Sequence, residues 1–354
     1  MMRREEEYRA VRCNVALSRM DHVGLLRLAG DEAIEAVDAI CSGDLWVRDG
    51  RMLQTLILDD QGKPVADVYV CPDNDACFLM VEGITTEQLS ACLAQHVDPD
   101  LDVQLEDLRP AHELLSVHGP YAWELMSRWL TPDIIGLPYL SFYRFDRGIC
   151  FRAGKTGEFG YDLMLRNEHA ADARRELLEL VSAFGGAEVS LETLDLCALE
   201  NGFFSVRHVS VEGLTPIELQ LQWRVSTRKR FPGVEAVEER RARGIRHRST
   251  HFVARDRVKR GDLVRGPEAP VGKVMTAAFS PAVGGIVGSA LLDISVAHPG
   301  IDEFFVRDGD FTLPIRTVSS PLLLNRSLLV DPRRHSYSTR EDAAHPPLWP
   351  GALP

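Results

Sequence analysis

One carboxylate stands out because of the residues around it. Asp67 lies in the segment Leu53–Val70, LQTLILDDQGKPVADVYV, where two alternating apolar runs flank a polar turn, the pattern of a β-hairpin. Val65, Asp67 and Tyr69 share one face of the second strand. A carboxylate between two apolar neighbours is costly to bury unless a partner compensates its charge, so Asp67 is a candidate for electrostatic or proton-transfer chemistry. An edge strand that turns Asp67 towards solvent is the alternative that this segment leaves open.

Four blocks of the chain, in order, resemble the glycine-cleavage T-protein (aminomethyltransferase) family. The first is the hairpin, whose usual family form ends in Gly-Gly-x-x-Asp-Asp-Leu. The second, RAGKTGEFGYDLML from Arg152, is similar to R-T-G-Y-T-G-E-D-G-F-E-I. The third, from Leu199 to Val237, is similar to L-E-A-G-…-T-P-L-E-x-x-L-x-W-x-V-…-F-x-G-x-x-A-L, and the fourth, from Val271 to Leu292, is similar to V-G-x-V-T-S-G-x-x-S-P-x-L. No single block is specific, but four in the same order are.

The resemblance implies an α+β fold of three domains around a central folate cavity, with two related α+β subdomains and a C-terminal β-barrel. We expect the folate-binding region, with its two intertwined subdomains, over residues 1–238. A basic linker is expected over 239–249 and the barrel over 250–330, where short strands alternate with Gly and Pro turns. Residues 331–354 are polar and proline-rich, which favours a flexible tail.

Two carboxylates match acidic positions of the family motifs. Asp67 matches the second of the paired aspartates, which implies a catalytic position beside the folate nitrogens that accept the one-carbon unit. A carboxylate there can stabilise the positive charge that grows as the carbon transfers. Asp162 matches the glutamate of G-F-E-I and would accept two parallel N–H bonds from the pterin edge. A strand aspartate that faces solvent is the alternative for Asp162.

Other candidates are less specific. Tyr69, Tyr161 and Trp223 are candidates for the walls of a ring pocket, although aromatic residues at strand spacing are also typical of a plain core. Glu82 replaces an amide of the family near the folate, and would either bind a cationic substrate or lie in a solvated turn. Leu194 stands where the family has an arginine that helps to hold the folate.

Composition excludes several classes of protein. The chain has 354 residues, too many for one compact core, and a net charge of −12, which argues against nucleic-acid binding. No apolar run approaches the roughly 20 residues of a membrane span, and no secretory signal follows the charged amino terminus. The seven cysteines form no C-x-x-C pair, so we expect free thiols in a reducing cytoplasm and no metal site.

These observations favour a tetrahydrofolate-dependent one-carbon transferase that moves a methyl or aminomethyl group. The family's opening segment normally precedes the block that begins here at Tyr8. We therefore expect a divergent member with a small-molecule substrate and no lipoyl carrier protein. A folate-binding accessory protein is one alternative, but Arg230 replaces the cysteine of the K-G-C-Y-x-G-Q-E motif of that branch. The other alternative is a T-protein-like fold reused without folate, which Leu194 and Glu82 keep open.

Overall fold

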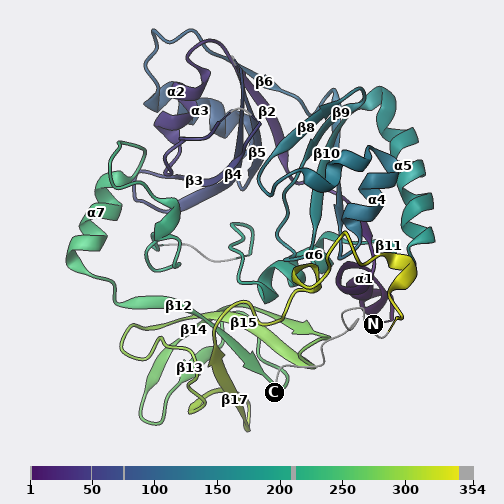
Figure 1. Cartoon of the computed structure of the whole chain (residues 1–354). Helices are drawn as coiled ribbons and strands as arrows, with labels where there is room; N and C mark the ends of the chain where they lie inside the picture. The colour runs from purple at the N-terminus through teal and green to yellow at the C-terminus, as the bar shows by residue number, and fades with distance from the viewer. Residues whose placement is uncertain (1, 49, 75, 209–212, 343–354) are drawn as a thin grey trace.

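Three sheets organise the chain, two side by side at the top of Figure 1 and a barrel beneath them. The computed structural model describes residues 2–48, 50–74, 76–208 and 213–342. Its elements alternate between helices and antiparallel strands, so the predicted α+β class and C-terminal barrel are confirmed.

The first sheet has six strands in the order β11-β1-β7-β10-β9-β8. Its strands are β1 (Ala16–Arg19), β7 (His112–His118), β8 (Phe142–Phe145), β9 (Gly148–Phe151), β10 (Gly160–Arg166) and β11 (Ala187–Glu188). The helices that accompany it are α1 (Met2–Cys13), α4 (Ala122–Trp129), α5 (Asn167–Ala183) and α6 (Leu191–Glu200). Apolar residues of the strands pack against α4 and α5 in one buried cluster, which stabilises this layer.

The second sheet has five strands in the order β3-β4-β5-β2-β6. Its strands are β2 (Gly24–Ala29), β3 (Leu53–Leu58), β4 (Pro64–Asp73), β5 (Ala76–Glu82) and β6 (Gln104–Asp107), and helices α2 (Ala33–Ile40) and α3 (Thr86–His96) pack on it. The chain leaves the first sheet after β1 and returns to it at β7, so the two subdomains are intertwined.

The predicted hairpin is formed by β3 and β4. Asp67 lies opposite Leu56 on one side and opposite Glu82 of β5 on the other. Because β4 is paired along both edges, Asp67 is on an inner strand and not at a solvent-facing edge. Its exposed fraction is only 3 %.

The barrel closes in the order β12-β15-β14-β13-β16-β17. Its strands are β12 (His247–Ala254), β13 (Leu263–Arg265), β14 (Pro270–Ser280), β15 (Gly285–Asp293), β16 (Phe304–Asp308) and β17 (Phe311–Val318). Closure pairs every edge and encloses a separate apolar cluster around Phe252.

The expected basic linker is largely regular structure. Residues 239–243 form the last turns of helix α7 (Val234–Arg243), and 247–249 begin β12, so only residues 244–246 connect them. Arg240, Arg241 and Arg243 lie in the last turn of α7. Cations are favourable at a helix C-terminus, which accounts for these three arginines.

The described part of the expected flexible tail, residues 331–342, packs against the first sheet and its helices. The ring of Tyr337 lies 5.0 Å from that of Phe184 and 5.4 Å from that of Tyr121. A short 3₁₀ helix, Tyr337–Thr339, forms there. Residues 331–342 thus pack on the first sheet and its helices through one aromatic side chain. Residues 343–354 lie outside the described residues.

One buried carboxylate joins three distant parts of the chain. Glu200, at the end of α6, accepts hydrogen bonds from the Tyr8 hydroxyl at 2.7 Å and the Ser280 hydroxyl at 2.6 Å. It also pairs with the guanidinium of Arg12. Because Glu200 is fully buried, these bonds fix α1, α6 and β14 against one another.

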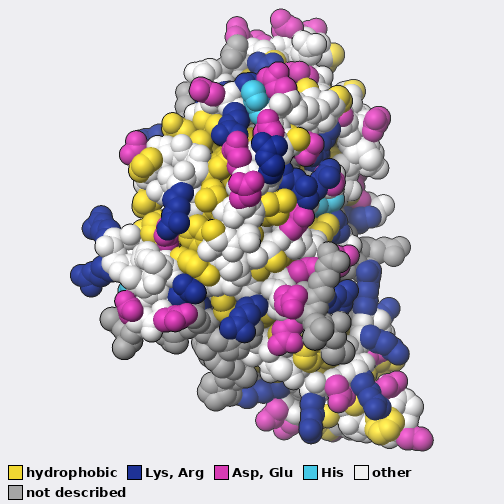
Figure 2. Space-filling view, turned by 90° about the vertical axis from the view of Figure 1, so that its right-hand side faces the viewer, with side chains coloured by type: hydrophobic (Ala, Val, Ile, Leu, Met, Phe, Trp, Pro, Cys, Tyr) yellow, Lys and Arg dark blue, Asp and Glu magenta, His cyan; other side chains and the backbone are white. Residues whose placement is uncertain are grey.

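The surface carries charges of both signs. Acidic and basic side chains are interspersed over the face seen in Figure 2, with apolar side chains among them. Among the helices of the described residues, none is long and apolar enough to cross a membrane.

Candidate functional site

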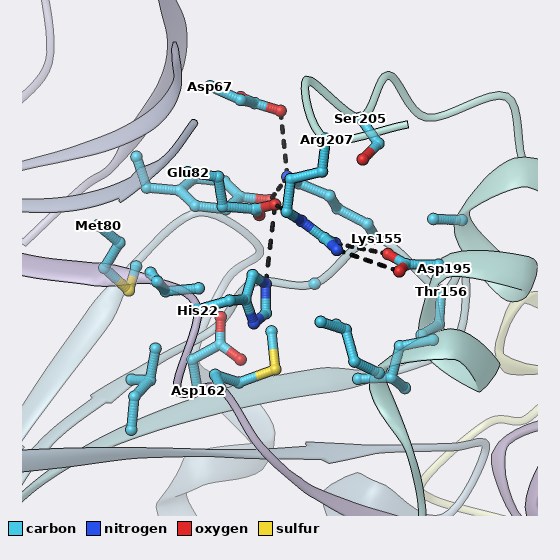
Figure 3. A pocket seen from close by; sticks show the side chains of 18 of the residues that line it. His22, Asp67, Met80, Glu82, Lys155, Thr156, Asp162, Asp195, Ser205 and Arg207 are labelled. Atoms are coloured by element: carbon cyan, nitrogen blue, oxygen red, sulfur yellow. Dashed lines mark hydrogen bonds and ion pairs between the residues drawn. The ribbon is translucent and has the colours of Figure 1, made fainter. Parts of the chain in front are cut away.

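A small cavity of about 60 Å³ lies where the two sheets meet helix α6. Strands β4, β5, β7 and β10, the loop before β10 and the segment after α6 all contribute to it (Figure 3). Its polar and charged lining residues are His22, Asp67, Tyr69, Glu82, His118, Lys155, Thr156, Asp162, Asp195, Ser205 and Arg207. Four of the predicted site residues therefore meet in one cavity: Asp67, Tyr69, Glu82 and Asp162.

Asp67 is held from two sides by cations. Its Oδ1 lies 3.0 Å from Nη1 of Arg224, and its Oδ2 lies 3.1 Å from Nζ of Lys155. Gln54, on the neighbouring strand, donates from Nε2 to Oδ1 at 3.1 Å. The carboxylate of Asp67, which was expected to need one compensating partner, has two cationic partners. Their charges explain why a carboxylate is tolerated on an inner strand.

Glu82 shares Lys155 with Asp67. Nζ of Lys155 lies 2.6 Å from Oε1 of Glu82, and Nε of Arg207 lies 3.2 Å from Oε2. Burial alone would raise the pKa of Glu82, but the charge and hydrogen bond of Lys155, together with Arg207, lower it to about 2. Burial would lower the pKa of Lys155, whereas Asp67 and Glu82 raise it above its ordinary value. Both groups are therefore charged at neutral pH.

The network continues to helix α6. Arg207 donates from Nη2 and Nη1 to the two carboxylate oxygens of Asp195, at 2.6 and 3.1 Å, in a bidentate pair. The sequence of groups is Arg224, Asp67, Lys155, Glu82, Arg207, Asp195, so the charges alternate in sign. With cations and carboxylates equal in number, this wall of the cavity is electrostatically balanced.

Asp162 lies on another wall and has no cationic partner among the described residues. Its Oδ1 accepts a hydrogen bond from the Ser116 hydroxyl, whose oxygen also lies 2.7 Å from Nε2 of His118. Burial raises the pKa of Asp162 to about 6, although Ser116 and Lys155 oppose the shift. Burial, and less so Arg152, lowers the pKa of His118 to about 4, so this imidazole is neutral at pH 7.

The raised pKa of Asp162 predicts a pH-dependent stability. The unfolded group titrates near 3.8 and the folded group near 6, so the folded state binds the proton more tightly. Stability from this group is therefore full below pH 4 and is lost as the pH rises to about 6. Asp162→Asn should remove that loss and raise the free energy of unfolding at pH 7 by about 2–3 kcal/mol. Urea unfolding of both proteins at pH 4 and pH 7 measures it; an equal difference at both values would contradict it.

Two of the predicted wall residues lie elsewhere. Tyr161 follows the two-residue period of β10 onto the face opposite Asp162, where it is buried in the core with α5. The guanidinium of Arg152 covers its ring at 4.5 Å. Trp223 is 68 % exposed and lines a second cavity. Tyr69, in contrast, is buried and lines the first cavity.

Several residues of the network were missed by sequence reasoning, namely Lys155, Arg207, Arg224, Ser116 and His118. Lys155 had a signal, because it stands where the motif R-T-G-Y-T-G has tyrosine. Arg224 and Ser116 had no such sequence signal. Arg224 meets Asp67, and Ser116 meets Asp162, only because the fold brings distant segments of the chain together.

The fold thus consists of two intertwined α+β subdomains and a closed barrel, and the carboxylate-lined cavity lies between the two sheets and α6. The crystal structure of glycine cleavage system aminomethyltransferase T from Bartonella henselae is similar, with a TM-score of 0.80 and 20 % identity over 90 % of this chain and 89 % of that one. The profile of the GCVT N-terminal domain matches residues 2–229, and the chain belongs to that family.

Curated relatives of the chain are named aminomethyltransferases, a class of one-carbon transferases. The protein of Thermotoga neapolitana is 27 % identical over 81 % of each chain. That of Parafrankia sp. (strain EAN1pec) is 31 % identical, over 82 % of this chain and 81 % of its own length. The chain is thus a member of a transferase family, and the likeness extends beyond the N-terminal domain.

Proposed function

We propose that the protein is a tetrahydrofolate-dependent one-carbon transferase that acts on a small molecule. The observation that carries this proposal is the meeting of Asp67 and Asp162, from separate motif-like blocks, in one buried cavity. The family of the chain and the names of its relatives support the reaction class. A methyl or aminomethyl group is the unit that we propose it transfers.

The residues of the cavity fit a pterin edge. Ser116 satisfies one oxygen of Asp162, which leaves the other available for N–H donors. The Ser205 hydroxyl is buried in the lining without a hydrogen-bond partner among the described residues, so it can accept or donate to a bound molecule. Tyr69 and Leu194 supply apolar surface beside these groups. Tetrahydrofolate, when bound, supplies the amine that accepts the carbon.

The present volume sets a condition on binding. The free space of about 60 Å³ in the cavity is small. Lys155 spans the cavity between Asp67 and Glu82, and its chain is flexible, so its displacement is the simplest way to enlarge the site (Figure 3). Asp67 would then face the bound molecule with Arg224 still in place, where it can stabilise developing positive charge.

Calorimetric titration with tetrahydrofolate and 5-methyl-tetrahydrofolate tests the proposal. If Asp162 holds the pterin edge, Asp162→Asn should weaken binding by about 1.5–3 kcal/mol, because an acceptor becomes a donor that faces another donor. This corresponds to roughly a 10- to 150-fold rise in Kd. Asp162→Glu, which restores the family residue, should keep or improve affinity. Unchanged affinity of the Asn variant would remove Asp162 from the site.

One observation favours the second candidate function, reuse of the fold without folate. Leu194 lines the cavity at 5 % exposure where the family has an arginine, so one charge-assisted anchor is missing. Absence of saturable binding by either folate would favour this alternative, and Leu194→Arg would then be expected to create binding.

A further inference from the structure

A second and larger cavity, of about 630 Å³, separates the barrel from the segment that follows α6. Barrel strands β12, β14 and β15 form one side, and residues 199–204 and 219–224 form the other. Part of the lining comes from the third and fourth motif-like blocks, and Trp223 is the one candidate site residue among the described residues that line it.

The barrel side presents a row of hydrogen-bonding side chains. His251 of β12 lies opposite Ser289 of β15, which lies opposite Thr276 of β14, so the three residues share one face. On the same face of β15, Val287 packs into one apolar cluster and Leu291 against another. This face of the barrel is therefore apolar at both ends and polar in the middle. Buried polar side chains are costly without hydrogen-bond partners, so the polar part is a candidate binding surface.

Four buried side-chain atoms of residues in this lining have no hydrogen-bond partner among the described residues. They are the hydroxyls of Ser289 and Thr250, Nδ1 of His251 and Nε of Arg224. Ser289, Thr250 and Arg224 are each only 4 % exposed. Nη1 of Arg224 is engaged by Asp67. Buried donors of this kind are costly to leave unsatisfied and are normally matched by an acceptor.

The charge of the lining is of one sign. Among the described residues that form it, Arg224 and Arg248 are cationic and none is Asp or Glu. Asp67, outside this lining, compensates the charge of Arg224, so Arg248 is the cation that remains uncompensated. The guanidinium of Arg248 donates to the backbone oxygen of Ala297, and no carboxylate pairs with it among the described ion pairs. In a chain of net charge −12, a cationic cavity without acidic residues favours an anion.

We propose that this second cavity binds a small organic carboxylate. Arg248 supplies charge at the rim, and Ser289 and Arg224 supply donors from the buried wall. A guanidinium and hydroxyls match the oxygens of a carboxylate. The indole of Trp223, which lies over the guanidinium of Arg224 at 4.9 Å, and the side chain of Phe203 offer apolar surface for the rest of the molecule.

The test uses calorimetric titration of the full chain with benzoate, with its neutral analogue benzamide and with inorganic phosphate. Benzoate should bind saturably with one molecule per chain, and at least tenfold more tightly than either other probe. Absence of saturable benzoate binding would overturn the proposal. Benzamide binding equal to that of benzoate would show an apolar pocket instead, and phosphate binding as tight would show a site for any oxyanion; each contradicts the carboxylate assignment.

Matched variants locate the bound benzoate. Arg248→Gln should raise the Kd for benzoate at least tenfold, and Arg248→Lys by less, because it keeps the charge but not the fork. Ser289→Ala should raise it about threefold to tenfold. The control is Arg246→Gln, which removes the same charge from an exposed residue outside the lining. An equal loss in the control, or no loss in both Arg248 variants and Ser289→Ala, would place the binding elsewhere.

Discussion

Replacing Asp67 by asparagine is expected to lower turnover by about 10²–10³-fold, while folate affinity changes less than about tenfold. Asparagine is nearly isosteric and still forms hydrogen bonds, but it lacks the charge proposed to stabilise the cation that develops as the carbon moves. Steady-state assays require a competent donor, so methylated and aminomethylated amines, aryl ethers and thioethers must first be screened with tetrahydrofolate. Asp60→Asn, in the exposed hairpin turn, is the control.

The same variant carries a stability cost. If Asp67 were buried without a partner, its replacement by asparagine would stabilise the folded protein. Asp67 is instead paired with Arg224 and Lys155. Loss of one partner from a buried ion pair typically costs about 3–5 kcal/mol, so Asp67→Asn should unfold at lower urea concentration. Activity must therefore be compared at conditions where both proteins are folded. Wild-type turnover in a folded Asn variant would leave Asp67 a structural carboxylate only.

Lys155→Met is expected to lower the free energy of unfolding at pH 7 by about 3–5 kcal/mol. Methionine keeps the length of the side chain but removes the cation that Asp67 and Glu82 share. The pKa of Glu82, about 2 in the native protein, should then rise, because Lys155 is the main charge that lowers it. In native Glu82 the stabilisation is present above its unfolded pKa of 4.5 and is lost as the pH falls towards 2. In the variant this stabilisation should be smaller, and its loss should be complete at a higher pH.

A double variant tests whether the loss of stability in Lys155→Met arises from the unpaired charge of Glu82. Lys155→Met combined with Glu82→Gln restores the balance of charges, so it should be more stable at pH 7 than Lys155→Met alone. Lys155→Arg, which keeps the cation, is the control and should lose less than Lys155→Met. Urea unfolding of the wild type, Lys155→Met, Lys155→Arg, Glu82→Gln and the double variant at pH 7 and pH 4.5 measures the coupling. A Lys155→Met protein as stable as the wild type, or a double variant with the sum of both losses, would show that the ion pairs are independent.

Residues at motif positions were predicted more accurately than residues chosen by their type alone. Asp67, Glu82 and Asp162 were selected from motif positions and Tyr69 as an aromatic candidate for a pocket wall, and the structure brings all four to one cavity. Motif positions carry such information because they sit at fixed places on strands whose order the fold determines. The hairpin, the intertwined sheets and the barrel followed from the same ordered blocks.

The other site contacts depend on tertiary structure, which local sequence patterns do not encode. Tyr161 is one residue from Asp162, and the alternation of a strand sends the two side chains to opposite faces. Arg224 reaches Asp67 across 157 residues of sequence, a pairing that no local pattern encodes. Tyr337 also packs on the rings of Tyr121 and Phe184, which are distant in sequence, so composition did not predict this contact.

The carboxylate of Glu200 has a consequence for the rate at which ligands enter the first cavity. Because Glu200 ties α1, α6 and β14 together, a movement of α6 relative to both α1 and the barrel would have to break buried bonds to Tyr8, Arg12 and Ser280. Displacement of Lys155 breaks ion pairs at the cavity wall and leaves this frame intact. Association should then follow two steps, with an observed rate that levels off at high ligand concentration at the frequency of side-chain release.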